Sequence, residues 1–285
     1  MSYGIKMMLL AGFAFAAMNV LIKLIPAIPA LEIVLFRSFI SFVISFWAIK
    51  RAKINLFGNN KPILVLRGVF GSIGLIAFFY TLQNMPLAAA SVIHYTSPVF
   101  TGIIAMVLLK EKMNTRQYVF FFISIIGVFT VYGFDLRVDF AGLSIGLLAA
   151  LSSAAAYNCI RKLQLTENPN VIILYFPLVA LPVSVCLILW MDSWVWPTGW
   201  DWFYLLLIGL LTQLAQYGMT VAYQNEKATK IAPISYVGIV YALVFGYFLF
   251  DETFDWKVLL GMFLVLLGVL LNIFQSRFVF IFKWK

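Results

Sequence analysis

The chain has 285 residues, of which 64% are hydrophobic and only 11% are charged. Soluble domains carry about one quarter charged residues, so this composition excludes a soluble globular protein. The formal net charge is +9, and the positions of the basic residues, considered below, exclude nucleic-acid binding as its explanation.

Ten apolar segments follow one another along the chain, each close to the roughly 20 residues that cross a bilayer as a helix. In chain order they cover residues 4–24, 31–49, 66–83, 90–109, 116–133, 143–163, 171–190, 202–223, 230–250 and 257–275. No connection between them is long enough to form a soluble domain. We therefore expect an all-α polytopic membrane protein with ten transmembrane helices and the lipid bilayer as its surroundings.

The basic residues gather in the connections that share one side of the membrane if the N-terminus is cytoplasmic. This arrangement assigns 16 of the 20 basic residues to the cytoplasmic side: Lys6, Lys50, Arg51, Lys53, Lys61, Arg67, Lys110, Lys112, Arg116, Arg161, Lys162, Lys227, Lys230, Arg277, Lys283 and Lys285. The positive-inside rule then predicts that both termini are cytoplasmic and that the protein lies in the cell (inner, cytoplasmic) membrane. The excess charge is a signal of topology, and we expect no nucleic-acid partner.

The residues that commonly bind metals are few and far apart. Cys159, Cys186 and the single histidine, His94, do not form a ligand cluster, so we expect no metal and no cofactor. The N-terminus resembles a signal peptide, with Lys6 before an apolar run and AFA at residues 14–16. The repeat described next predicts instead that this segment is retained.

The second half of the chain repeats the first. At an offset of 139, "AAMNVLIKL" lies over "AAYNCIRKL", which pairs Asn19 with Asn158. At an offset of 141, "QNMPLAAASVIHYTSPVF" (83–100) lies over "QNEKATKIAPISYVGIVY" (224–241). The repeat predicts that the chain consists of two copies of a five-helix unit.

The number of spans in each copy determines how the two copies are related. Five is odd, so the second unit, residues 140–285, must lie inverted relative to the first unit, residues 1–139. Inverted repeats are a recurring architecture of secondary transporters, in which the substrate binds near the membrane midplane between the halves. The repeat therefore predicts alternating access.

The segment "LQNMPLAAASVIHYTSPVFTGIIAMVLLKEKMN" combines a small-residue turn, a mid-span proline and an acidic residue at the end of the fourth span. Together with the second-half segment "ISYVGIVYALVFGYFLFDETF" and the two five-span halves, it resembles the EamA-like family of the drug/metabolite transporter superfamily. The resemblance implies transport of amino acids, nucleosides, cofactors or similar small solutes, a central cavity lined by spans 1–4 and 6–9, and peripheral spans 5 and 10. The second half carries Gly238-Ile239 where the first has Ser97-Pro98, which leaves open whether both halves bend alike.

The fourth predicted span carries polar groups on one helical face. Ser91, His94, Pro98 and Thr101 follow the helical period, and Tyr95 stands beside them. Pro98 cannot donate to the carbonyl of His94, so we expect a kink there. This face either lines the path of a solute or packs against a neighbouring helix.

The eighth predicted span carries a polar stripe of Gln213, Gln216, Tyr217, Thr220 and Gln224. The matching positions of the third span are less polar. A structural stripe would tend to survive in both copies, so the difference favours a role in substrate specificity. The alternative is that the amides bridge neighbouring helices.

Arg37 lies about 9 Å inside the second span at 1.5 Å per residue. It either extends to the outer surface or holds an acidic group of the solute, whereas Lys23, near a span end, is expected to reach the surface. For both Asn19 and Asn158, the sequence favours a structural role and a binding role equally. The candidate substrate-binding residues are Asn19, Arg37, Tyr80, Ser91, His94, Tyr95, Asn158, Gln213, Gln216, Tyr217, Thr220 and Tyr236.

Acidic residues and glycines suggest structural contacts. Glu111 and Glu252 end the fourth and ninth spans, where a role in surface anchoring or in latching a gate fits better than solute binding. Gly68, Gly71 and Gly74 in the third span predict close helix packing.

We expect a secondary transporter of a small organic metabolite, such as an amino acid or a nucleoside-like or cofactor-like solute, that acts as an exporter, exchanger or facilitator. No acidic residue lies in the middle of a span, so coupling runs through His94 or is absent, and we favour its absence. A lipid or polyprenyl-carrier translocator is the alternative. An intramembrane enzyme is disfavoured because the spacing of Ser91 and His94 is merely the helical period. We expect a monomer or a homodimer.

Overall fold

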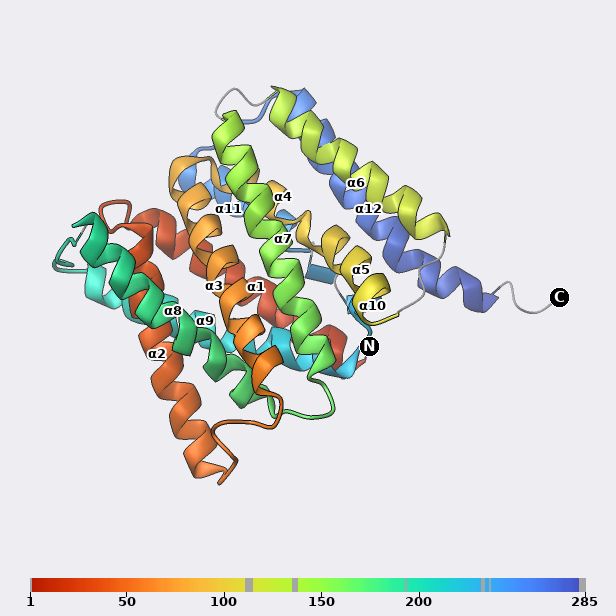
Figure 1. Cartoon of the computed structure of the whole chain (residues 1–285). Helices are drawn as coiled ribbons and strands as arrows, with labels where there is room; N and C mark the ends of the chain where they lie inside the picture. Colours follow the sequence, from red (N-terminus) through yellow and green to blue (C-terminus); the bar gives the residue numbers. More distant parts are fainter. Residues whose placement is uncertain are drawn as a thin grey trace.

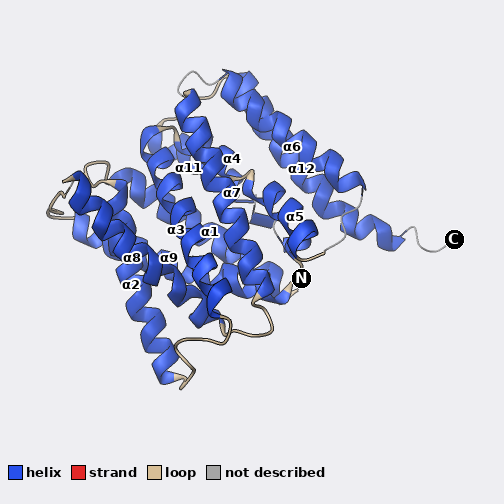
Figure 2. Ribbon diagram, in the orientation of Figure 1, coloured by secondary structure: helices blue, strands red, loops and turns tan. Residues whose placement is uncertain are grey.

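The computed structural model describes residues 2–110, 115–134, 138–192, 194–231, 234–235 and 237–281. In these ranges the chain is helical and contains no strand (Figures 1 and 2). The helices are α1 (Tyr3–Leu24), α2 (Ala30–Arg51), α3 (Lys61–Asn84), α4 (Leu87–His94), α5 (Ser97–Leu108), α6 (Thr115–Phe134), α7 (Phe140–Lys162), α8 (Pro169–Met191), α9 (Asp201–Asn225), α10 (Ala228–Ile231), α11 (Val237–Phe250) and α12 (Trp256–Ile281).

Most of these helices are long and apolar enough to cross a membrane. Within the described ranges seven stretches meet both criteria: α1, α2, α3, the stretch Ala89–Leu108, α7, α8 and α9. Shorter apolar stretches occupy Tyr118–Gly127, Val240–Phe250 and Trp256–Gly268. The chain is therefore an all-helical, multi-pass membrane protein, as the composition predicts, whereas ten spans and their inverted arrangement stay predictions.

The fourth predicted span is broken in its middle. Helix α4 ends at His94 and α5 begins at Ser97, and the amide of Tyr95 donates the last bond of α4, to the carbonyl of Ser91 (2.8 Å). Pro98 lies in the first turn of α5, where its missing N–H leaves no helical bond unmade. The kink expected from Pro98 is confirmed, and it takes the form of a complete break.

The helices pair across the two halves of the sequence. Helix α1 packs on α9, α3 on α7, and α2 on α8, so each of these pairs joins an element before residue 140 to one after it. Helices α6 and α12 form a further pair, set beside the rest of the bundle (Figure 1). This position agrees with the peripheral fifth and tenth spans that the family resemblance implies.

Glycines allow α3 to approach two neighbours closely. A Cβ atom added at Gly68 would lie 2.5 Å from the carbonyl oxygen of Tyr175 in α8. One added at Gly74 would lie 2.8 Å from Oγ of Ser153 in α7. The close packing predicted at these two positions is confirmed, and small residues at such contacts are typical of membrane helix pairs.

One end of the bundle, where α1 begins and α9 ends, is held together by Glu167. We call it the basic end because Lys53 lies in one of its connections and Lys61 and Lys162 lie at the helix ends beside them. The Glu167 carboxylate accepts hydrogen bonds from the backbone amides of Asn59 (2.5 Å) and Asn60 (2.6 Å). Its backbone carbonyl accepts one from Nε2 of Gln224 (2.9 Å). Glu167 therefore joins the α2–α3, α7–α8 and α9 segments.

Replacing Glu167 should destabilise this end of the bundle. Glu167→Ala leaves two amides at the start of α3 without their charged acceptor, and such bonds contribute about 1.5–3 kcal/mol each. We expect a loss of roughly 2 kcal/mol or more in the free energy of unfolding, measured by denaturation of the detergent-solubilised protein. Asn59→Ala is the matched control, since it removes only an exposed side-chain bond to the carbonyl of Thr166. Equal losses in both variants would contradict the role given to Glu167.

Candidate functional site: a central cavity with two buried arginines

A cavity of about 100 Å³, open at its mouth, lies between α1, α2, α3, α7, α8 and α9 and beside the break between α4 and α5. Its polar and aromatic lining residues include Asn19, Arg37, Arg67, Phe78, His94, Tyr95, Ser97, Ser153, Tyr157, Phe176, Gln216, Tyr223 and Ser235. The lining therefore draws on helices from both halves of the chain.

Two arginines are the dominant charges of the cavity. Arg37 is 0% exposed and Arg67 is 2% exposed. The Cζ atom of each lies 5.5 Å from the ring centre of Phe176, and Arg37 also lies 5.3 Å from that of Phe79. The two guanidinium groups are thus neighbours through one aromatic ring, whose faces attract cations.

The burial of these arginines settles one question that the sequence left open and corrects one assignment. Arg37 does not reach the outer surface, because its side chain is enclosed by the cavity wall. The assignment of Arg67 to the cytoplasmic connection is wrong. Helix α3 begins at Lys61, five residues before the predicted span, so Arg67 lies nearly two turns inside the helix.

The Arg67 side chain is positioned from two sides. Its Nη2 donates a hydrogen bond to Oε1 of Gln216 (3.0 Å). A Cβ atom added at Gly71, one turn further along α3, would collide with Nη1 of Arg67 and would lie 2.8 Å from the ring of Phe176. Gly71 therefore leaves room for the charged group of Arg67 and also packs closely on Phe176 of α8, as predicted.

The break between α4 and α5 places two aromatic groups on the cavity wall. The ring of His94 stacks on that of Phe78 with a centroid distance of 4.2 Å. The ring of Tyr95 lies at the cavity as well, and a Cβ atom added at Gly238 of α11 would overlap its hydroxyl group. The helix break and the missing side chain at Gly238 together make space for Tyr95.

The structure brings five of the predicted site residues to the cavity: Asn19, Arg37, His94, Tyr95 and Gln216. Two other predicted residues are engaged between helices. Gln213 accepts from Oγ of Ser41 (2.6 Å) and donates to Oγ of Ser45 (3.0 Å). Asn158 donates to the carbonyls of Thr101 and Ala154. These contacts are the helix-bridging roles that were the alternatives for both residues.

The remaining predicted residues lie elsewhere. Ser91 and Thr220 are buried between helices but do not line the cavity. Tyr80 and Tyr217 are 47% and 37% exposed and face away from it. Tyr236 lies outside the described residues.

Some lining residues were not singled out by sequence reasoning. Tyr157 and Phe176 lie on the wall, as does Met18. The repeat alignment held a partial signal, because Met18 and Tyr157 occupy paired positions just before Asn19 and Asn158. No pattern in the sequence distinguishes Phe176 from the other apolar residues of α8.

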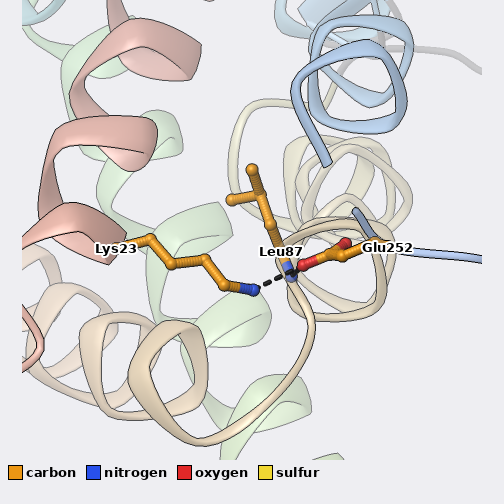
Figure 3. A network of polar contacts seen from close by, with 3 residues as sticks. All are labelled: Lys23, Leu87 and Glu252. Atoms are coloured by element: carbon orange, nitrogen blue, oxygen red, sulfur yellow. Dashed lines mark hydrogen bonds and ion pairs between the residues drawn. The ribbon is translucent and has the colours of Figure 1, made fainter. Parts of the chain in front are cut away.

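At the end of the bundle opposite the basic end, an ion pair joins the two halves. Nζ of Lys23 lies 2.5 Å from Oε1 of Glu252, and the same oxygen accepts a hydrogen bond from the amide of Leu87 (2.7 Å) (Figure 3). We call Lys23, Leu87 and Glu252 the latch. Lys23 turns to Glu252 in place of the surface position expected for it, and Glu252 makes the kind of contact that gate latching requires. Glu111 lies outside the described residues.

Comparison with solved structures supports the fold. A crystal structure superposes on the chain with a TM-score of 0.74 and covers 97% of both chains, at 17% sequence identity. The likeness extends over the whole bundle and concerns the fold alone.

Comparison with other sequences identifies relatives that cover nearly the whole chain. The pseudopaline exporter CntI of Pseudomonas aeruginosa (strain UCBPP-PA14) is 33% identical over 260 residues, which cover 90% of this chain and 91% of that protein. Solute carrier family 35 member G1 of Mus musculus is 29% identical, and the match covers 89% of this chain and 73% of that protein. The S-adenosylmethionine uptake transporter of Rickettsia prowazekii is 24% identical, and the match covers 86% of this chain and 83% of that protein. The sequence model of the EamA-like transporter family matches residues 2–133 and again residues 140–274, and the chain belongs to this family.

Proposed function

We propose that the protein is a secondary transporter that moves a small organic metabolite through the central cavity by alternating access. The observation that carries this proposal is a cavity lined by charged, polar and aromatic side chains from helices of both halves, in a chain of a transporter family. The relatives named above include an exporter and an uptake transporter of small molecules. Direction of transport differs between them, so it is a property to be measured for this chain.

The proposal includes ten spans arranged as two inverted units, residues 1–139 and 140–285. The two separate matches of one family model support two units. The three shorter apolar stretches, in α6, α11 and α12, supply the spans beyond the seven long ones. We further propose that the basic end faces the cytoplasm of the cell, since the connections rich in Lys and Arg lie there, and that the protein works as a monomer or a homodimer.

Alternating access requires contacts that close one end of the cavity while the other end is open. The latch joins α1, the start of α4 and the end of α11 at one end of the bundle. The Glu167 contacts join other segments at the basic end. We propose that exchange between these two sets of contacts opens the cavity to each side in turn.

The neighbouring residues Gln216 and Tyr217 test whether the cavity is the transport path. Gln216 lines the cavity and accepts a bond from Arg67, whereas Tyr217 faces away from it. In proteoliposomes assayed by counterflow with amino acids, nucleosides and S-adenosylmethionine, we expect Gln216→Ala to reduce transport about tenfold, the equivalent of 1.4 kcal/mol. Tyr217→Ala should stay within about twofold of the unchanged protein. The opposite ranking would place the path elsewhere.

A further inference from the structure

The two cavity arginines have guanidinium nitrogens that contact no acceptor. In the described part of the chain, Nε and Nη2 of Arg37 and Nε and Nη1 of Arg67 are buried without a hydrogen-bond partner. The contacts recorded for Arg37 are the sulfur of Met18 at 3.8 Å and two aromatic rings. Both residues line the cavity.

No carboxylate neutralises this pair of charges. Among the described residues, the cavity lining includes no Asp or Glu. Glu32, on the same helix as Arg37, is engaged elsewhere, because its Oε1 accepts from the amide of Val195 (2.6 Å). Glu252 belongs to the latch. Two buried cations therefore share one cavity without an anionic partner among the described residues.

An unpaired charge inside a membrane protein is costly, and such groups commonly mark the path of a substrate or an ion. Cation–π contacts with Phe176 offset part of the cost but leave the N–H donors unsatisfied. The polar neighbour of Arg67, Gln216, is uncharged and occupies only one of its nitrogens. The missing partner is an anion from outside the chain.

The chemistry of the donors defines this anion. Guanidinium groups present planar, forked donors that match carboxylate and phosphate oxygens in bidentate pairs. The N-terminus of α5, at Ser97, also borders the cavity, and its helix dipole adds positive potential there. Both arginines contact one ring, that of Phe176, so both lie beside the same part of the cavity wall.

We infer that the cavity binds an organic anion with two acidic groups, carboxylate or phosphate, one at Arg37 and one at Arg67, with its apolar or planar part against the aromatic wall. This inference rests on the proposed function, because it names the class of solute that the transporter carries. Arg37 and Arg67 are then the residues that select the charge of the solute, and Gln216 is a positioning residue that orients Arg67.

Binding tests the inference directly. The melting temperature of the detergent-purified protein is measured at constant ionic strength against a series of small anions with two acidic groups: the aliphatic dicarboxylates from succinate to pimelate, isophthalate, and 3-phosphoglycerate as the phosphate arm. Isophthalamide and m-xylylenediamine are the neutral and dicationic counterparts of isophthalate. We expect at least one dianion to stabilise the protein and neither counterpart to do so. The comparison of carboxylates with the phosphate ester identifies which acidic group is preferred.

Substitutions assign the effect to the arginines. Arg37→Gln and Arg67→Gln should each weaken binding of the stabilising dianion at least tenfold. Without ligand, each should raise the melting temperature by about 2 °C or more, since an uncompensated buried charge is removed. A merely structural arginine would lower it. Arg51→Gln is the matched control, because Arg51 is an exposed arginine at the end of the same helix and contacts only the ring of Trp47 among the aromatic residues described; it should leave binding within twofold.

Three results would overturn the inference: no dianion stabilises the protein, the neutral or cationic counterpart stabilises it equally, or both Gln variants bind the dianion unchanged. Counterflow in proteoliposomes separates this inference from the proposed function. If both Gln variants still transport a neutral or cationic solute, the inference of an anionic substrate is wrong, while the proposed function as a transporter still holds. Arginine-dependent binding of a dianion, with no flux of any solute, would support the site and overturn the proposed function.

Discussion

Glu252→Gln should open the latch end of the cavity and raise the labelling of a cysteine at position 19 about tenfold. Asn19 lines the cavity on α1, one turn before Lys23, so a cysteine there reports access from the latch end. The measurement uses Asn19→Cys in a protein whose two native cysteines, Cys159 and Cys186, are replaced by alanine. A membrane-impermeant thiol reagent is added to each side of sealed vesicles in turn.

Glutamine in place of Glu252 removes the negative charge and keeps the size and shape of the side chain. A glutamine at this position keeps an oxygen that can accept the bond from the Leu87 amide, while the ion pair with Lys23 is lost. Breaking a buried pair costs about 3–5 kcal/mol, and exposed pairs contribute about 0.2–1 kcal/mol. The Glu252 side chain is 6% exposed and that of Lys23 is 22% exposed, so an intermediate effect of about 1.4 kcal/mol is expected, which is tenfold in an equilibrium.

A second ion pair provides the control. Lys230 and Glu226 form an exposed i,i+4 pair at 2.6 Å, beyond the end of α9 and therefore at the basic end. Lys230→Gln breaks this other Lys–Glu pair and should leave labelling from the latch side unchanged. Unchanged labelling in Glu252→Gln would show that the ion pair does not close this end.

The class of fold was predictable because burial in lipid imposes it on every residue of a span. Runs of apolar residues located the long helices, and the position of Pro98 located the break between α4 and α5. Helix ends were less predictable. Apolar windows started the third span at residue 66, whereas α3 begins at Lys61, and this difference hid the burial of Arg67.

The candidate site was predictable only in part, for a geometric reason. The polar stripe of α9 is wider than the part of the helix that faces the cavity. Gln213 faces Ser41 and Ser45 of α2, Gln216 faces the cavity, and Tyr217 faces outward, although all three lie in a stretch of five residues. Helical periodicity gives the angle between side chains, but only the packing of neighbouring helices determines what each one meets.

Among glycine-to-alanine substitutions in α3, Gly68→Ala should destabilise the protein most. The new Cβ atom would lie 2.5 Å from the carbonyl oxygen of Tyr175 and 2.7 Å from Cγ2 of Val179. A valine methyl group can move, but the backbone carbonyl moves only with α8. Overpacking of this kind costs about 1–3 kcal/mol, of which helix propensity returns up to about 1 kcal/mol. We expect a net loss of about 2 kcal/mol and a melting temperature lower by roughly 5 °C.

The displacement of α8 should also reach the cavity. Phe176, the ring shared by the two cavity arginines, follows Tyr175 directly, so a shift of α8 moves the surface on which both guanidinium groups rest. Gly68→Ala should therefore weaken binding of the stabilising dianion as well as stability. Gly12→Ala is the control for stability, because a Cβ atom there would meet nothing within 4 Å and improves helix propensity. If Gly68→Ala and Gly12→Ala have the same melting temperature, α3 and α8 can move apart freely, and other contacts determine the position of Phe176.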